Sequence, residues 1–199
     1  MTQLDPKTVA MLHFERLAQA AEAVAEQLGP GIATYADWAL TTLRAGGRLL
    51  FCGNGGSAAT AEHVATEYVV RFRRNRPPLP AIALTGSTGS LTAGANDFGF
   101  EGVFVRPLLA LGRSDDLLIV HSTSGASPNV LAVARAAAEV PIRTVALVGA
   151  AGGPLTELVD HSIRVPSSDT ATIQELHLAV EHAVADYVDA WFAAETGAS

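Results

Sequence analysis

The 199-residue chain has few of the features that mark secreted, membrane or nucleic-acid-binding proteins. Its one cysteine, Cys52, cannot form an intrachain disulfide, and its first residues lack the charged-then-apolar pattern of a secretory signal. No apolar run approaches the ~20 residues that a membrane span requires. Acidic residues outnumber basic ones by 20 to 13, and the net charge of -7 opposes non-specific attraction to DNA or anionic lipid. We therefore expect a cytoplasmic protein that binds neither membrane nor nucleic acid.

Charged residues are also scarce, at 17%, whereas 49% of the chain is apolar. This composition is typical of a well-packed globular protein, and the length suits one compact unit. Within that unit we expect an N-terminal helical extension over residues 1–45 and a main domain over residues 46–199.

The apolar pattern predicts alternating helices and strands. Asp5 and Pro6 resemble a helix N-cap and first turn, and this helix should stop at Gly29 and Pro30. A second helix is expected over residues 32–43. Short buried strands are expected over residues 48–52, 81–85, 116–121, 143–148 and 161–165, and helices over 58–72, 128–138 and 171–194. The alternation predicts an α/β fold: a doubly wound, five-stranded parallel sheet with helices on both faces.

Two loops that follow predicted strands carry polar and flexible residues. The glycine loop, residues 52–57, opens a helix, and its free amide groups favour an oxyanion or polyol, although a simple tight turn fits as well. The serine loop, residues 122–127, places four hydroxyl groups before another helix. Ser127 alone could be an N-cap before Pro128, but one cap does not need four hydroxyls. We interpret the serine loop as a phosphate cradle.

A basic cluster, residues 71–78, contains four arginines and one phenylalanine. Nucleic-acid binding is one interpretation. We favour a structural one, in which solvated arginines complement the dipole at a helix end.

Five motifs occur in an order that resembles the SIS (sugar isomerase) family, and within it the phosphoheptose isomerases. The resemblance covers about residues 46 to 190 and rests on Gly53-Asn54-Gly55-Gly56-Ser57, His63 with Glu67, residues 96–100, Ser122-Thr123-Ser124-Gly125 and residues 173–177. Membership implies the flavodoxin-like form of the predicted sheet, a homotetramer with active sites at subunit contacts, and one zinc ion per subunit.

The resemblance also implies a role for individual residues. The acid/base pair would be Glu67 and His182. The metal ligands would be His63, Glu67, Gln174 and His182. The residues in contact with the sugar phosphate would be Asn54, Gly55, Gly56, Glu67, Asn96, Asp97, Ser122, Thr123, Ser124, Ser127 and Gln174.

The chain departs from the usual family residues at three positions, which carry His121, Ala126 and Thr172. These changes bear on the substrate more than on the reaction type, because the hydroxyl cradle and the four implied metal ligands are intact.

The spacing of the implied site residues suits aldose-ketose isomerisation. This reaction needs one group to move a carbon-bound proton and another to handle the protons of the hydroxyl and carbonyl oxygens. His63 and Glu67 are four residues apart and share one face of a helix. Gln174 and His182 lie about 80° apart around a helix. His63 and Glu67 could also be an ordinary polar pair on a helix surface.

Other polar and apolar side chains receive simpler interpretations. We expect His177 to be a buried histidine satisfied by its neighbours, and Cys52 to be a packed small side chain. Glu175 and Glu181 resemble solvated or interface carboxylates. An apolar stripe on the first and last helices exceeds what one sheet face can cover, which predicts an oligomer.

The sequence thus predicts an isomerase that converts sedoheptulose 7-phosphate to D-glycero-D-manno-heptose 7-phosphate through an enediol. Three alternatives stay open: isomerisation of another sugar phosphate, a non-catalytic SIS protein of the type that binds the replication initiator, and a sugar-phosphate sensor. The sensor is the weakest, because such regulators usually carry a DNA-binding domain for which this chain has no room.

Overall fold

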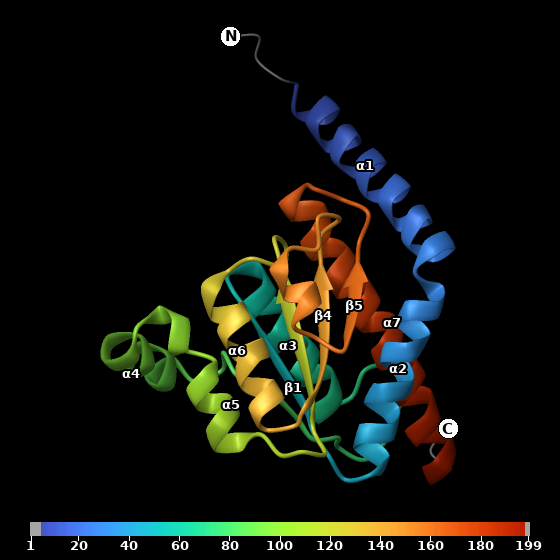
Figure 1. Cartoon of the computed structure of the whole chain (residues 1–199). Coiled ribbons are helices and arrows are strands. Elements are labelled where there is room, and N and C mark those ends of the chain that lie inside the picture. Colours follow the sequence, from blue (N-terminus) through green and yellow to red (C-terminus); the bar gives the residue numbers. More distant parts are fainter. Residues whose placement is uncertain (1–4, 198–199) are drawn as a thin grey trace.

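The computed structural model describes residues 5–197, which form a five-stranded sheet covered by helices (Figure 1). In chain order the elements are α1 (Pro6–Gln27), α2 (Gly29–Arg44), β1 (Leu49–Gly53), α3 (Gly56–Val69), β2 (Ala81–Ala83), α4 (Thr88–Phe98), a 3₁₀ turn (Phe100–Gly102), α5 (Val105–Leu111), β3 (Leu117–Ser122), α6 (Pro128–Glu139), β4 (Arg143–Val148), a second 3₁₀ turn (Pro154–Glu157), β5 (His161–Arg164) and α7 (Thr170–Thr196).

The sheet has the order β2-β1-β3-β4-β5, and every described pair of strands is parallel, which confirms the predicted fold class. The order reverses between β1 and β3. In open parallel sheets, ligands bind beyond the carboxyl ends of the strands at such a switch point. The glycine loop follows β1 and the serine loop follows β3, so the fold brings the two predicted ligand loops to this place.

Both faces of the sheet are buried, because alternate residues of each strand point to opposite sides. Phe51 and Ile119 face a core shared with α2, α3 and α7. Leu50 and Val120 face a second core shared with α5 and α6. Figure 1 shows α6 and α7 on opposite sides of the strands. Cys52 belongs to the second core, and burial raises the pKa of its thiol, which agrees with a packing role.

The N-terminal helix begins and ends as predicted. The side chain of Asp5 caps it by accepting from the Thr8 backbone N–H at 3.1 Å. No residue of α1 is buried, and the helix extends beyond the body of the protein (Figure 1). Phe14 is 66% exposed. The apolar stripe of α7, by contrast, is covered within the chain, since Val180 and Val184 are buried. The stripe of the last helix therefore belongs largely to the core of one chain, and the exposed apolar side chains that bear on the predicted oligomer lie on α1.

The segment between β2 and β3 contains two helices, α4 and α5, that the apolar pattern did not predict. The side chain of Ser87 caps α4, but no residue of the helix is fully buried. Its contact with the second core is limited to half-buried side chains such as Leu91 and Ala95, so its apolar pattern is weak. The strand expected over residues 81–85 is also shorter and ends at Ala83.

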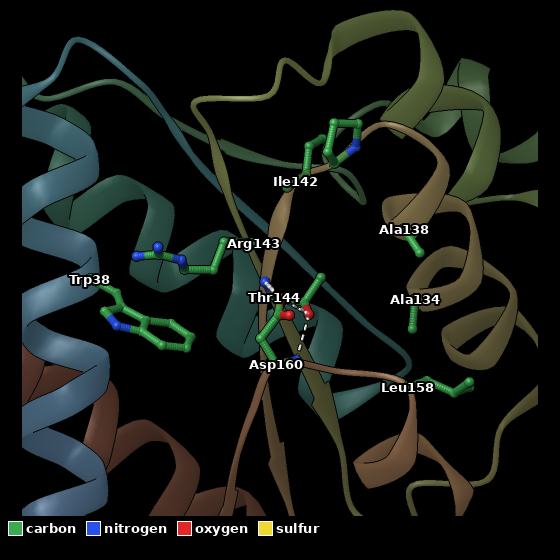
Figure 2. A pocket seen from close by; sticks show the side chains of 9 residues that line it. Trp38, Ala134, Ala138, Ile142, Arg143, Thr144, Leu158 and Asp160 are labelled. Atoms are coloured by element: carbon green, nitrogen blue, oxygen red, sulfur yellow. Dashed lines mark hydrogen bonds between the residues drawn. The ribbon is translucent and has the colours of Figure 1, made fainter.

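A cavity of about 520 Å³ lies at the amino end of β4, away from the switch point (Figure 2). The Arg143 guanidinium lies 4.6 Å from the centre of the Trp38 ring there. Thr144 binds the Asp160 carboxylate through its backbone N–H and its hydroxyl, both at 2.8 Å. The lining includes no histidine, and we assign no chemistry to it.

No helix within residues 5–197 is both long enough and apolar enough to span a membrane.

Candidate active site

The glycine loop and the serine loop leave neighbouring strands, with Gly53 of β1 paired to His121 of β3. A side chain at Gly53 would clash, because a Cβ there would lie 2.9 Å from the His121 carbonyl oxygen. A Cβ at Gly56 would lie 2.4 Å from the amide oxygen of Gln174. The glycines therefore allow close contact with β3 and α7, and Gln174 is held against the glycine loop.

The serine loop is shaped by its own hydroxyls. Ser122 Oγ accepts from the Gly125 backbone N–H at 3.1 Å, and Ser124 Oγ accepts from the Ala126 N–H at 3.3 Å. Gly125 has φ of +61°, and a Cβ there would lie 1.9 Å from the Gly152 carbonyl oxygen. This position needs glycine for both its backbone conformation and its close contact.

Ser127 stands at the N-cap position of α6, but its side chain makes no capping hydrogen bond. Capping alone therefore does not explain this serine. The helix N-terminus, the half-buried Thr123 and the exposed Ser124 lie together in a loop suited to an anion.

Asn54 of the glycine loop is paired with Asn129 of α6. Each amide donates to the other's oxygen at 2.8 Å, and Asn129 is buried. This pair joins the two loops. Sequence reasoning missed Asn129, which follows Pro128 in the first turn of a helix and has no signal other than its place beside the serine loop.

Three implied site residues meet at one point. His63 Nε2 lies 3.2 Å from Glu67 Oε1 and 3.1 Å from His182 Nε2, and one ligand atom of each residue lies within 4.8 Å of the others. Two imidazoles and a carboxylate are a common ligand set for zinc, so the donors fit the implied metal. The cluster by itself does not identify which metal it would bind. Burial, followed by the nearby His63, lowers the pKa of His182, whereas Glu67 opposes this shift.

The remaining implied residues are not joined to this cluster by described contacts. Gln174 contacts the glycine loop at Gly56. Asn96 and Asp97 lie on α4, where the Asn96 amide donates to Asp97 Oδ1 at 2.8 Å, and both are exposed. Figure 1 shows α4 and α7 on opposite sides of the sheet.

A buried polar network lies beneath the switch point. Glu181 is fully buried, which corrects its interpretation as a solvated or interface carboxylate. Its two oxygens lie 2.7 Å from His121 Nε2 and 2.8 Å from the Tyr35 hydroxyl that donates to it. Burial, and then the charge of Glu181, raise the pKa of Tyr35, so this hydroxyl remains a donor. His121 thus has a buried partner on α7.

The interpretation of the basic cluster, residues 71–78, is also corrected in part. Arg76 is only 7% exposed, so it is not a solvated arginine. It donates to the backbone oxygens of Glu67 and Tyr68 at the end of α3, which agrees with the predicted complement to a helix dipole.

His177 is buried as predicted, but neither ring nitrogen makes a regular hydrogen bond with the described residues. Burial first, and then the nearby His121, lower its pKa from 6.5 to about 3, although the Val148 backbone opposes the shift. The ring is therefore neutral in the folded protein at pH 7.

The doubly wound sheet, with two polar loops at its switch point and a His-Glu-His cluster between α3 and α7, has the arrangement of an α/β enzyme. A family model described as the SIS domain matches residues 13–149. The phosphoheptose isomerase of Roseiflexus sp. is 51% identical over 164 residues, which cover 82% of this chain and 83% of that protein. That of Rhodospirillum rubrum is 46% identical over 176 residues, which cover 88% of this chain and 89% of that protein.

Solved structures agree with these relatives. A phosphoheptose isomerase from Francisella tularensis aligns with a TM-score of 0.90 and 38% identity, over 94% of this chain and 99% of that one. The enzyme from Neisseria gonorrhoeae aligns with a TM-score of 0.88 and 37% identity, over 94% of this chain and 100% of that one. The chain belongs to the SIS domain family and groups with its phosphoheptose isomerases, so it is an isomerase.

The lowered pKa of His177 predicts a loss of stability in acid. The unfolded chain takes up a proton near pH 6.5 that the folded protein resists, so stability falls as the pH drops from 6.5 towards 3. The contribution is at most about 1.4 kcal/mol per pH unit. Urea unfolding at several pH values should give a shallower pH dependence for His177→Asn than for wild type. Equal slopes would contradict this assignment, and His13→Asn, with a half-buried ring, is the control.

Proposed function

We propose that the chain interconverts sedoheptulose 7-phosphate and D-glycero-D-manno-heptose 7-phosphate through an enediol. The observation that carries the proposal is the meeting of Glu67, His63 and His182 between α3 and α7, in a chain whose relatives are named phosphoheptose isomerases. The single buried cysteine suits the reducing cytoplasm as its compartment.

The phosphate of the sugar binds the serine loop, where Ser122, Thr123, Ser124 and Ser127 and the N-terminus of α6 provide neutral donors. Asn54, Gly55 and Gly56 line the path of the open-chain sugar. The helix dipole and the backbone amides suit a dianion without a lysine or arginine.

Proton transfer uses the carboxylate of Glu67 and the imidazole of His182. Glu67 removes a proton from carbon 1 of the ketose, which gives the enediol, and a proton returned to carbon 2 gives the aldose. His182 moves a proton between the two oxygens. Its lowered pKa favours the neutral ring, which can accept a proton at one nitrogen and donate from the other.

A divalent cation at this cluster, zinc by the ligand set, would be held by His63, Glu67, His182 and Gln174. When bound it would polarise the carbonyl and hydroxyl oxygens of the sugar.

The assembly proposed is a homotetramer. Exposed apolar side chains on α1, among them Leu12 and Phe14, need a covering surface that the described part of the chain does not supply. The exposed helix α4 carries Asn96 and Asp97, so an active site at a subunit contact would allow these residues to reach the sugar on a neighbouring subunit.

Substitution of either member of the acid/base pair should lower turnover sharply while folding survives. Glu67→Gln and His182→Gln each should lower kcat for sedoheptulose 7-phosphate by about 100- to 10,000-fold, because general acid/base groups contribute on this scale. The assay follows aldose formation by the purified protein.

The controls separate proton transfer from metal binding. His63→Ala and chelator-treated wild type lose the metal but keep Glu67 and His182. If they lose as much activity as the Glu67 and His182 variants, the metal alone accounts for the effect. Near-normal turnover by Glu67→Gln would refute the proposed mechanism, and a wild type that turns over only another sugar phosphate would correct the substrate.

The serine loop should control substrate affinity more than turnover. Ser124→Ala removes an exposed hydroxyl and should raise KM several-fold, with a much smaller effect on kcat. Inorganic phosphate should compete with the sugar phosphate in wild type and compete less well in this variant. An unchanged KM and an unchanged inhibition constant would remove Ser124 from the phosphate site.

The oligomer should depend on α1. Light scattering should give a particle of four times the 20.6 kDa chain mass. Phe14→Glu, which places a charge on the exposed apolar face, should reduce the particle mass. A monomeric wild type at micromolar concentration would contradict the tetramer, and Lys7→Glu, a charge change elsewhere on α1, is the control.

A further inference from the structure

The segment that joins α3 to β2 is anchored by one buried ion pair. Arg76 Nε donates to Asp189 Oδ1 on α7 at 3.0 Å, and the side chains are 1% and 0% exposed. Buried charges of this kind must be fully paired, because removal of one partner leaves the other without compensation. The pair therefore fixes the position of this segment against α7.

The carboxylate of Asp189 organises the first part of the segment. Its oxygens accept from the backbone N–H groups of Phe72, Arg73 and Arg74 at 3.4, 3.0 and 2.6 Å. This wrapping places the ring of Phe72 against the imidazole of His182, with centroids 5.1 Å apart and planes 24° apart. One face of His182 is thereby packed by a segment that Asp189 holds.

The guanidinium of Arg76 organises the end of α3. Nη2 donates to the carbonyl oxygen of Glu67 at 2.7 Å, and Nη1 donates to that of Tyr68 at 2.7 Å. The fixed geometry of a guanidinium suits this three-way contact, whereas a lysine ammonium could not span it. Arg76 thus holds the backbone of Glu67, while its ionic partner lies on the helix that carries His182.

We propose that Arg76 and Asp189 are positioning residues of the isomerase site, which fix Glu67 and His182 relative to each other. This inference rests on the proposed function. Among the described contacts, neither Arg76 nor Asp189 touches a side chain of the His-Glu-His cluster. The pair therefore acts through the Glu67 backbone and through Phe72. Misplacement of a catalytic group by about 1 Å can cost up to about 100-fold in rate.

The chain offers a matched control at the start of the central strands β1 and β3. Arg48 and Asp116 also form a largely buried ion pair, with Nη2 2.7 Å from Oδ2. Asp116 likewise accepts from backbone N–H groups, those of Arg48 at 2.8 Å and Arg113 at 3.0 Å. Arg48 also donates to the carbonyl of Leu111 at the end of a helix. The control pair is similar in type, but its described contacts reach neither Glu67 nor the segment that packs on His182.

The experiment compares Asp189→Asn and Arg76→Lys with Asp116→Asn by steady-state kinetics and thermal unfolding. Asp189→Asn and Asp116→Asn should both lower Tm, since each removes a buried charge that has partners. Only Asp189→Asn and Arg76→Lys should lower kcat, by about 10- to 100-fold, with KM little changed. If Asp116→Asn loses kcat to the same extent, or if Asp189→Asn keeps wild-type kcat, the proposal is overturned.

A spectroscopic measurement tests the positioning without turnover. The imidazole protons of His182, assigned by comparison with His182→Gln, should carry a ring-current shift from Phe72 that is lost in Asp189→Asn and kept in Asp116→Asn. If wild type fails to isomerise sedoheptulose 7-phosphate, the proposed function fails, and this signal still decides the positioning. Should a single variant be insoluble, Arg76→Met with Asp189→Leu, which leaves no unpaired charge, replaces it. An unchanged His182 signal in that double variant would also overturn the proposal.

Discussion

The packing of α7 against α2, α3 and the sheet is the constraint on which the site depends. Apolar residues such as Val184 supply most of the contact, and each fully buried valine contributes roughly 1.5–3 kcal/mol. Apolar contact alone fixes the helix loosely. Two buried carboxylates, Glu181 and Asp189, fix it more tightly, because each is paired with groups from other elements. A rotation of α7 would leave both without partners, at a cost of about 3–5 kcal/mol each. His182, next to Glu181, takes its place from this arrangement.

The chemistry follows from where the sheet reverses its order. The loops after β1 and β3 separate at the switch point, so amides, hydroxyls and a helix N-terminus gather there without a charged side chain. The proposed acid/base groups come from outside the sheet, Glu67 from α3 and His182 from α7. In the proposed function, substrate binding and proton transfer are thus placed by different elements. This division explains why a serine loop substitution should change KM while a substitution of Glu67 should change kcat.

Much of the fold could be predicted, because buried parallel strands appear as short apolar runs and a helix with one covered face repeats every 3.6 residues. Helix α4 could not, since it buries none of its residues fully and packs only loosely on the second core through Leu91 and Ala95. The burial of charged residues also could not be predicted from the sequence pattern. Glu181 resembles a solvated glutamate until His121, 60 positions earlier, is known to face it. Arg76 stands among exposed arginines, and its partner Asp189 lies 113 positions away. The cluster of His63, Glu67 and His182 came from the family resemblance, because spacing alone indicated only a pair on one helix.

The central claim is that this cluster moves a carbon-bound proton through an enediol. The most direct test is to run the reaction in deuterium oxide and to determine, by proton NMR and mass spectrometry, whether the aldose carries deuterium at carbon 2. Proton transfer by Glu67 allows exchange with solvent, so the account predicts deuterium at that carbon in at least part of the product. An aldose that forms at the wild-type rate with no deuterium at carbon 2 would indicate a direct hydride shift and contradict the account.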